Sequence, residues 1–261
     1  MKMVDEEIFF FDKHIARLQK GMKILKMNLT SQSLLAEKSN NHTNEIVDGL
    51  KSKILQIAKK NNHSNSCKIR LQVFRDGIGE GYTPNCNDAK YIIETSILSN
   101  KKYEHNSTGI ILGLYSDIKK PQNILSNIKT SNALYSVLAG IYAKENQIDD
   151  CLLLNESGYI SEAISSNIFI IKNDIIYTPS LNQGCIDGIM RNNVIEQARK
   201  TNISVVEKQI TIDEVKNADE VFLTNVIKGI VSVKSFMRSN YKPQNIYSKY
   251  ALSFDVVKQG L

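Results

Sequence analysis

The stretch from Lys129 to Arg191 constrains this chain most, because it combines a lysine, a glutamate and a glycine-opened helix in a fixed order. Glu162 lies in the strand-like segment ISEAISSNIFII, and Gly188 opens a helical segment that continues as NNVIEQARK. Lys129 directly precedes a predicted helix. Its apolar residues recur at helical spacing: Leu134, Val137, Leu138, Ile141 and Tyr142.

Each of these three features has a chemistry that suits one ligand. A lysine that loses its proton in a desolvated pocket can form a Schiff base with a carbonyl group. A carboxylate beside a pyridine nitrogen keeps that nitrogen protonated and makes the ring an electron sink. Free N–H groups at a helix N-terminus bind a phosphate. Taken singly, each is more often a solvated side chain or an ordinary turn, but together they predict a pocket for a phosphorylated pyridine aldehyde.

Five blocks of the chain, in order, resemble the fold-type IV pyridoxal phosphate (PLP) enzymes, the class IV aminotransferase family. The blocks are Lys129, Glu162 to Phe169, Tyr177-Thr178-Pro179, Gly188 to Arg191, and ADEVFLTNVIKGIVSV at 218 to 233. This family includes branched-chain amino acid aminotransferases, D-amino acid aminotransferases and 4-amino-4-deoxychorismate lyases. The resemblance covers essentially the whole chain. It implies a two-domain α+β fold with mixed α/β character, like that of D-amino acid aminotransferase.

The resemblance also implies roles for individual residues. Lys129 would bind PLP as a Schiff base and then move a proton on the substrate. Glu162 would pair with the pyridine nitrogen, and Ile186 would pack against one face of the ring. The backbone N–H groups of Ile189 and Met190 would bind the cofactor phosphate.

Further positions match parts of the family's site more loosely. Arg17, in HIARLQKGMKIL, falls where the family places an arginine on the phosphate, and a guanidinium fork suits that ligand. Asn225 and Val226 match a segment that lines the phosphate and the substrate carboxylate. Arg75 and Ile227 match positions near the substrate.

The chain departs from the family pattern at two phosphate positions and at its start. Met190 and Val226 stand where many members have threonine, so the phosphate would depend more on backbone N–H groups and on Arg17. Some lyases of the family share the methionine. The opening MKMVDEEIFFFDKH corresponds to the strand after the family's Tyr-Gly-Asp-Gly-x-Phe-Glu type segment. We therefore expect an N-terminal truncation, which would remove a threonine implicated in the lyase chemistry.

Three functions are consistent with these residues. The first is a PLP-dependent class IV aminotransferase, which moves an amino group between an amino acid and a 2-oxo acid through a Schiff base on Lys129. The alternative is a 4-amino-4-deoxychorismate lyase, which forms 4-aminobenzoate and pyruvate for folate synthesis. The third is a truncated PLP-binding protein with impaired catalysis. The family is usually a homodimer with the active site near the subunit interface.

Composition narrows the class of protein. The chain has 261 residues, 42% apolar and 23% charged, as is typical of globular proteins, and no apolar run long enough to span a bilayer. Its four cysteines show no paired CxxC spacing, which argues against a metal site and favours free thiols in a reducing cytoplasm. The net charge of +6 is spread over the chain, which predicts a solvated surface and no nucleic-acid partner.

The predicted elements divide the chain into two domains. We predict a small α+β domain over 1–115, a linker over 116–123 around Pro121, and a large cofactor-binding domain over 124–261. FFF at 9–11 should end a strand. Helices are predicted at 12–28 and 44–60, strands at 68–74, 90–98 and 109–114, a hairpin-like pair at 167–177, and a terminal helix from Asn245.

Overall fold

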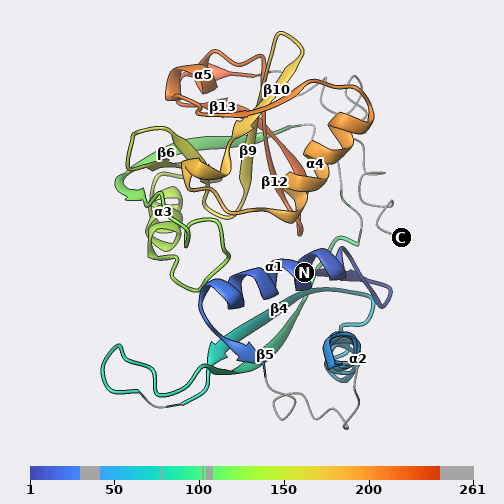
Figure 1. The fold of residues 1–261 in the computed structure, drawn as a ribbon. Helices are drawn as coiled ribbons and strands as arrows, with labels where there is room; N and C mark the ends of the chain where they lie inside the picture. The colour runs from blue at the N-terminus through green and yellow to red at the C-terminus, as the bar shows by residue number, and fades with distance from the viewer. Residues whose placement is uncertain (30–41, 78, 102, 104–107, 242–261) are drawn as a thin grey trace. The chain divides into compact units, whose positions relative to one another are not determined.

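The computed structural model describes residues 1–29, 42–77, 79–101, 103 and 108–241 (Figure 1). It confirms the mixed α/β class. The chain divides into two compact units, Met1–Lys102 and Tyr103–Leu261. This break lies earlier than the predicted one, because strand β6 (Ile110–Lys120) pairs with β7 and β13 in the sheet of the second unit. The same strand continues through the first part of the predicted linker. The unpaired segment begins only at Pro121.

The first unit is a five-stranded sheet in the order β2-β1-β4-β5-β3, with two helices. Its elements are β1 (Lys2–Val4), β2 (Glu7–Ile8), α1 (Phe11–Ile24), β3 (Asn28–Leu29), α2 (His42–Lys60), β4 (Ser66–Arg75) and β5 (Asp88–Ile97). The expectation that residues 9–11 end a strand is wrong. The strand ends at Ile8 and Phe11 opens α1, because Phe11 and Ile15 then lie one helical turn apart and are buried in the same core cluster.

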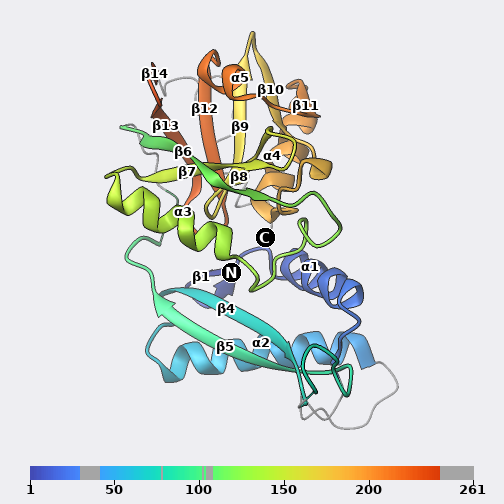
Figure 2. The same cartoon turned by 90° about the vertical axis from the view of Figure 1, so that its left-hand side faces the viewer.

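The second unit contains a nine-stranded sheet in the order β11-β10-β9-β12-β13-β6-β7-β8, with β14 on β13 (Figure 2). Its remaining strands are β7 (Asp150–Asn155), β8 (Ile160–Ala163), β9 (Asn167–Lys172), β10 (Ile175–Pro179), β11 (Val205–Lys208), β12 (Glu220–Asn225), β13 (Gly229–Phe236) and β14 (Ser239–Asn240). The helices are α3 (Leu134–Glu145), the 3-10 turn Leu181–Gln183, α4 (Ile189–Lys200) and α5 (Ile212–Lys216).

Strands β9 and β12 are neighbours in the sheet of this unit and are almost entirely buried. Five of the six residues of β9 are buried, and four of them form the apolar run IFII. Phe169 pairs with Phe222 across the two strands, and their rings stack with centroids 4.9 Å apart. Val194 of α4 packs against the same cluster. The predicted hairpin is confirmed, since β9 and β10 pair antiparallel and turn through Asn173 and Asp174, both with positive φ. Asn167, at the start of β9, is thereby held firmly.

Helix α3 turns the apolar stripe predicted from its sequence outward. Leu134, Val137 and Ile141 are 71, 55 and 48% exposed. The buried side is instead formed by Ala139 and Ala143, whose small side chains let the helix approach β6 and β7 closely. The spacing of these apolar residues therefore predicted the helix correctly, but the residues lie on its exposed face.

Two sequence predictions concern other parts of the chain. The terminal helix expected from Asn245 onward lies outside the described residues. Within the described residues, no helix is both long and apolar enough to cross a membrane.

Candidate active site

Ile186 lies at the junction of the segments that contain the predicted site residues. Its N–H donates to Glu162 Oε2 at 2.8 Å, and its carbonyl accepts from Asn167 Nδ2 at 2.9 Å. The peptide is thus held from both sides, by the carboxylate of β8 and by the first side chain of β9. These two bonds fix the approach to α4 relative to Glu162.

Asn127 joins the lysine-bearing loop to the same segment. Its side chain donates to the carbonyl of Cys185 at 2.8 Å, and its carbonyl accepts the N–H of Asp187 at 3.0 Å. These contacts lie immediately before and after Ile186. Ile128 is buried, whereas Lys129 is exposed in the loop that precedes α3. Lys129 therefore follows directly from a loop that is anchored beside Ile186.

Glu162 is buried and makes a contact that the sequence did not suggest. Its side chain is 5% exposed, and Oε1 forms an ion pair with Nζ of Lys120, whose side chain is 1% exposed. Lys120 Nζ also lies 5.5 Å from the ring centroid of Tyr135. Burial, and secondarily the negative charge of Glu162, raise the pKa of Tyr135 above its ordinary value. Lys120 was missed because, in the polar run SDIKKPQN, it has the pattern of a linker residue.

The start of α4 has the properties of an anion site. Gly188 is the N-cap, and Ile189 and Met190 open the helix. Because these are the first two residues of the helix, their N–H groups have no acceptor within it. A Cβ on Gly188 would lie 1.9 Å from Oδ1 of Asn167, so no larger residue fits there without movement. The close approach of Asn167 thus explains the glycine.

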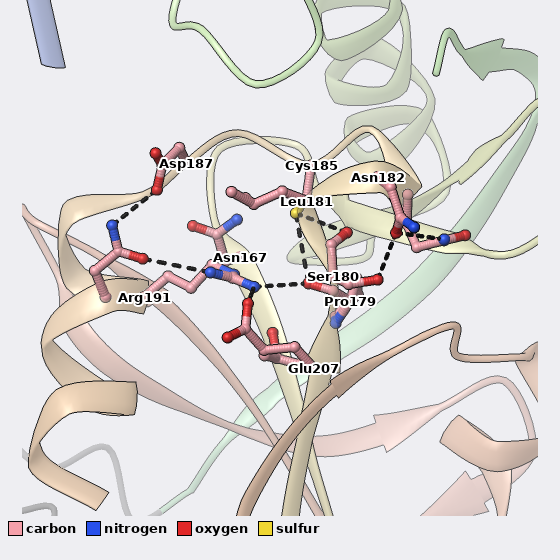
Figure 3. A network of polar contacts seen from close by, with 12 residues as sticks. Asn167, Pro179, Ser180, Leu181, Asn182, Cys185, Asp187, Arg191 and Glu207 are labelled. Carbon is pink, nitrogen blue, oxygen red and sulfur yellow. Dashed lines mark hydrogen bonds and ion pairs between the residues drawn. The ribbon is translucent and has the colours of Figure 1, made fainter. Parts of the chain in front are cut away.

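Arg191 fixes the first turn of α4 to the sheet (Figure 3). It is 1% exposed, and Nη2 donates to the carbonyl of Pro179 at 2.9 Å and to Glu207 Oε2 at 2.6 Å. Asn192 accepts from Arg191 at 3.3 Å and donates to Asp187 at 2.8 Å. Arg191, the last residue of the Gly188–Arg191 block, therefore binds residues of β10 and β11.

The loop after β12 lies at the same end of the sheet, because Thr224 pairs with Asn167. Asn225 shapes this loop. Its Nδ2 donates to Ser166 Oγ at 3.0 Å, and its Oδ1 accepts the N–H groups of Ile227 at 3.0 Å and Lys228 at 2.8 Å. Thr224 Oγ1 is buried and has no hydrogen-bond partner among the described residues. Thr224, near the end of β12, therefore presents a buried polar atom beside the start of β9.

Tyr103 anchors the other side of this loop. Its hydroxyl donates to the carbonyl of Val226, and its ring closely approaches Gly229, which has a φ of +76°. Burial raises the pKa of Tyr103. The predicted residues Asn225, Val226 and Ile227 thus lie on a well-held loop.

Arg17 and Arg75 belong to the first unit. Arg17 is half-buried on α1. Arg75 Nη2 donates to the carbonyl of Leu25 at 2.7 Å, and Nη1 donates to the carbonyls of Lys26 and Cys86 at 3.3 Å. Arg75 therefore joins the end of α1 to the β4–β5 connection, and its role near a substrate stays a prediction, as does that of Arg17.

The second unit contains groups whose chemistry suits a PLP molecule. A buried carboxylate suits a protonated pyridine nitrogen, and the N–H groups of Ile189 and Met190 suit a phosphate. Glu162 and the start of α4 are linked through Ile186 and the short segment to Gly188. Among the described residues, no group of three or more His, Cys, Asp and Glu side chains has the arrangement of a metal site.

Comparison with known proteins gives the same family over nearly the whole chain. A family model described as amino-transferase class IV matches residues 1–236. A probable branched-chain-amino-acid aminotransferase of Aquifex aeolicus is 32% identical over 87% of this chain and 68% of its own length. Branched-chain-amino-acid aminotransferase-like protein 2 of Arabidopsis thaliana is 27% identical over 87% of this chain. The matched stretch spans 38, 37 and 59% of the length of three curated relatives.

Solved structures share the fold. A putative 4-amino-4-deoxychorismate lyase from Legionella pneumophila superposes with a TM-score of 0.82 at 23% identity. The superposition covers 100% of this chain and 89% of that one. The branched-chain amino acid aminotransferase of Escherichia coli gives a TM-score of 0.78 at 23% identity, over 97% of this chain and 83% of that one.

Proposed function

This chain belongs to the amino-transferase class IV family, and from that premise we propose that it is a PLP-dependent aminotransferase. Its substrates would be an amino acid and a 2-oxo acid such as 2-oxoglutarate. The observation that supports this proposal best is the set of hydrogen bonds around Ile186. It draws together the lysine loop, the buried carboxylate of Glu162 and the start of α4.

When bound, PLP supplies the electron sink that stabilises negative charge at the substrate carbon. The residues of this chain position it and move the proton. Glu162 would hold the ring nitrogen, and the N–H groups of Ile189 and Met190 would hold the phosphate. Lys129, in the loop that Asn127 anchors, would move the proton at the substrate carbon.

A lyase that releases pyruvate from 4-amino-4-deoxychorismate is the second candidate. Met190 is the observation that favours it, because this position opens α4 without the hydroxyl that many aminotransferases of the family have. The lyase would use Lys129, Glu162 and the same cofactor. Only the fate of the substrate differs, with elimination in place of amino transfer.

One experiment separates the two activities. The purified chain with PLP is given a panel of branched-chain and D-amino acids with 2-oxoglutarate, and glutamate is measured. In parallel it is given 4-amino-4-deoxychorismate without a 2-oxo acid, and pyruvate is measured. We expect glutamate from at least one amino acid. If pyruvate forms and glutamate does not, the chain is a lyase and not an aminotransferase. If neither product forms, both proposals are contradicted.

We also propose that two copies of the chain associate. The outer face of α3 exposes Leu134, Val137, Leu138 and Ile141, which lie at helical spacing on one side. A contiguous apolar face of this kind marks a protein-protein contact. Light scattering should therefore give about twice the chain mass of 29.4 kDa.

Val137→Glu should shift this species toward the monomer, because a charge would have to be buried in the contact. Lys144→Gln changes the net charge by the same amount on the same helix and should leave the mass unchanged. A monomeric wild type, or an unchanged mass for Val137→Glu, would contradict the proposed association.

A further inference from the structure

We propose that Lys120 competes with the cofactor's ring nitrogen for the Glu162 carboxylate, and so weakens the preference of this chain for a protonated ring. The inference rests on the proposed function, in which Glu162 faces that nitrogen. It assigns Lys120 as a positioning residue, since it acts through Glu162 and not on the substrate.

Lys120 is placed to have this effect. It is the last residue of β6, its side chain is 1% exposed, and Nζ contacts Oε1 of Glu162. The other contacts of the ammonium group are weak by comparison, with the carbonyl of Ser126 at 3.4 Å and the ring of Tyr135 at 5.5 Å. A buried ammonium needs a counter-charge. Glu162 is therefore its principal partner.

Both carboxylate oxygens of Glu162 already accept a hydrogen bond. Oε2 accepts the N–H of Ile186 at 2.8 Å, and Oε1 faces Lys120. Among the described residues, Lys120 is the only side chain that forms an ion pair with Glu162. A ring nitrogen that approaches this carboxylate must thus share it with an ammonium group that already neutralises it.

The consequence is a coupling between Lys120 and the proton on the ring nitrogen. Two cations that share one carboxylate weaken each other, because each reduces the negative charge that the other meets. Without the lysine charge, the protonated nitrogen would have no competing cation at this buried carboxylate among the described residues. The chain would then discriminate more strongly against a cofactor that lacks this nitrogen.

The test compares PLP with 1-deaza-pyridoxal phosphate, in which carbon replaces the ring nitrogen. Dissociation constants for both are measured with wild type, Lys120→Met, Lys120→Arg and Lys119→Met. The ratio of the deaza constant to the PLP constant should rise about tenfold or more in Lys120→Met, since a hydrogen bond to a charged group is at stake. Lys120→Arg keeps the charge and should retain the wild-type ratio. Lys119 is the exposed neighbour on β6, and its variant should also match wild type.

An unchanged or lower ratio in Lys120→Met overturns the inference, as would equal losses of affinity for both cofactors, which indicate a purely structural lysine. If Lys120→Met does not fold, Lys120→Gln carries the same test, because it keeps an N–H donor without the charge. A wild type that binds neither cofactor contradicts the proposed function, and the inference fails with it. If wild type binds PLP but the ratio of the two dissociation constants does not rise in Lys120→Met, only the inference about Lys120 is contradicted.

Discussion

Lys129→Ala is expected to lower the rate of amino transfer by at least about 10³-fold, because it removes both the group that binds the cofactor aldehyde and the group that moves the proton. The visible absorption band of lysine-bound PLP should disappear. Stability should change by no more than about 0.5 kcal/mol, since Lys129 is exposed on its loop. Spectra, turnover and thermal unfolding of the same preparations give the three values.

Lys144→Ala is the matched control, because Lys144 is an exposed lysine at the end of α3. It should keep the visible band and the wild-type rate. Lys129→Ala protein that folds normally and retains full activity would remove Lys129 from the mechanism. The buried Lys120, beside Glu162, would then be the first residue to examine.

Gly188→Ala is expected to have the second largest effect, on both stability and cofactor affinity. The added Cβ would lie 1.9 Å from Oδ1 of Asn167, so Asn167 or the start of α4 must move. Overpacking of this kind costs about 1–3 kcal/mol. The movement would disturb the bond from Asn167 to the Ile186 carbonyl and tilt the N–H groups of Ile189 and Met190. We therefore expect weaker PLP binding as well as a lower free energy of unfolding, measured by titration and by urea denaturation.

Gly140→Ala on α3 isolates the steric effect. No atom lies within 4 Å of a Cβ built at Gly140, and alanine favours a helix more than glycine does. This variant should be as stable as wild type or more stable, with unchanged PLP affinity. A Gly188→Ala protein with the same behaviour would show that the contact with Asn167 is not restrictive.

Much of the fold was predictable because it follows from local patterns. The run NIFII and the turn at Asn173 and Asp174 predict the β9–β10 hairpin from residues that are adjacent in sequence. The orientation of α3 was not predictable. Its large apolar residues face outward because Ala139 and Ala143 form the closer contact with the sheet, and that choice depends on β6 and β7.

The candidate site divides in the same way. The sequence alone predicted Lys129, Glu162 and the glycine-opened helix as parts of the site, because their residue types and order resemble one family. Only the tertiary structure shows Glu162 and Asn167 holding Ile186 from two sides, Arg191 bound to Glu207, and Lys120 paired with Glu162. These contacts join residues far apart in the chain. An ion pair such as Lys120 with Glu162 arises only where β6, β7 and β8 lie side by side, and no local pattern of charge or hydrophobicity encodes that adjacency.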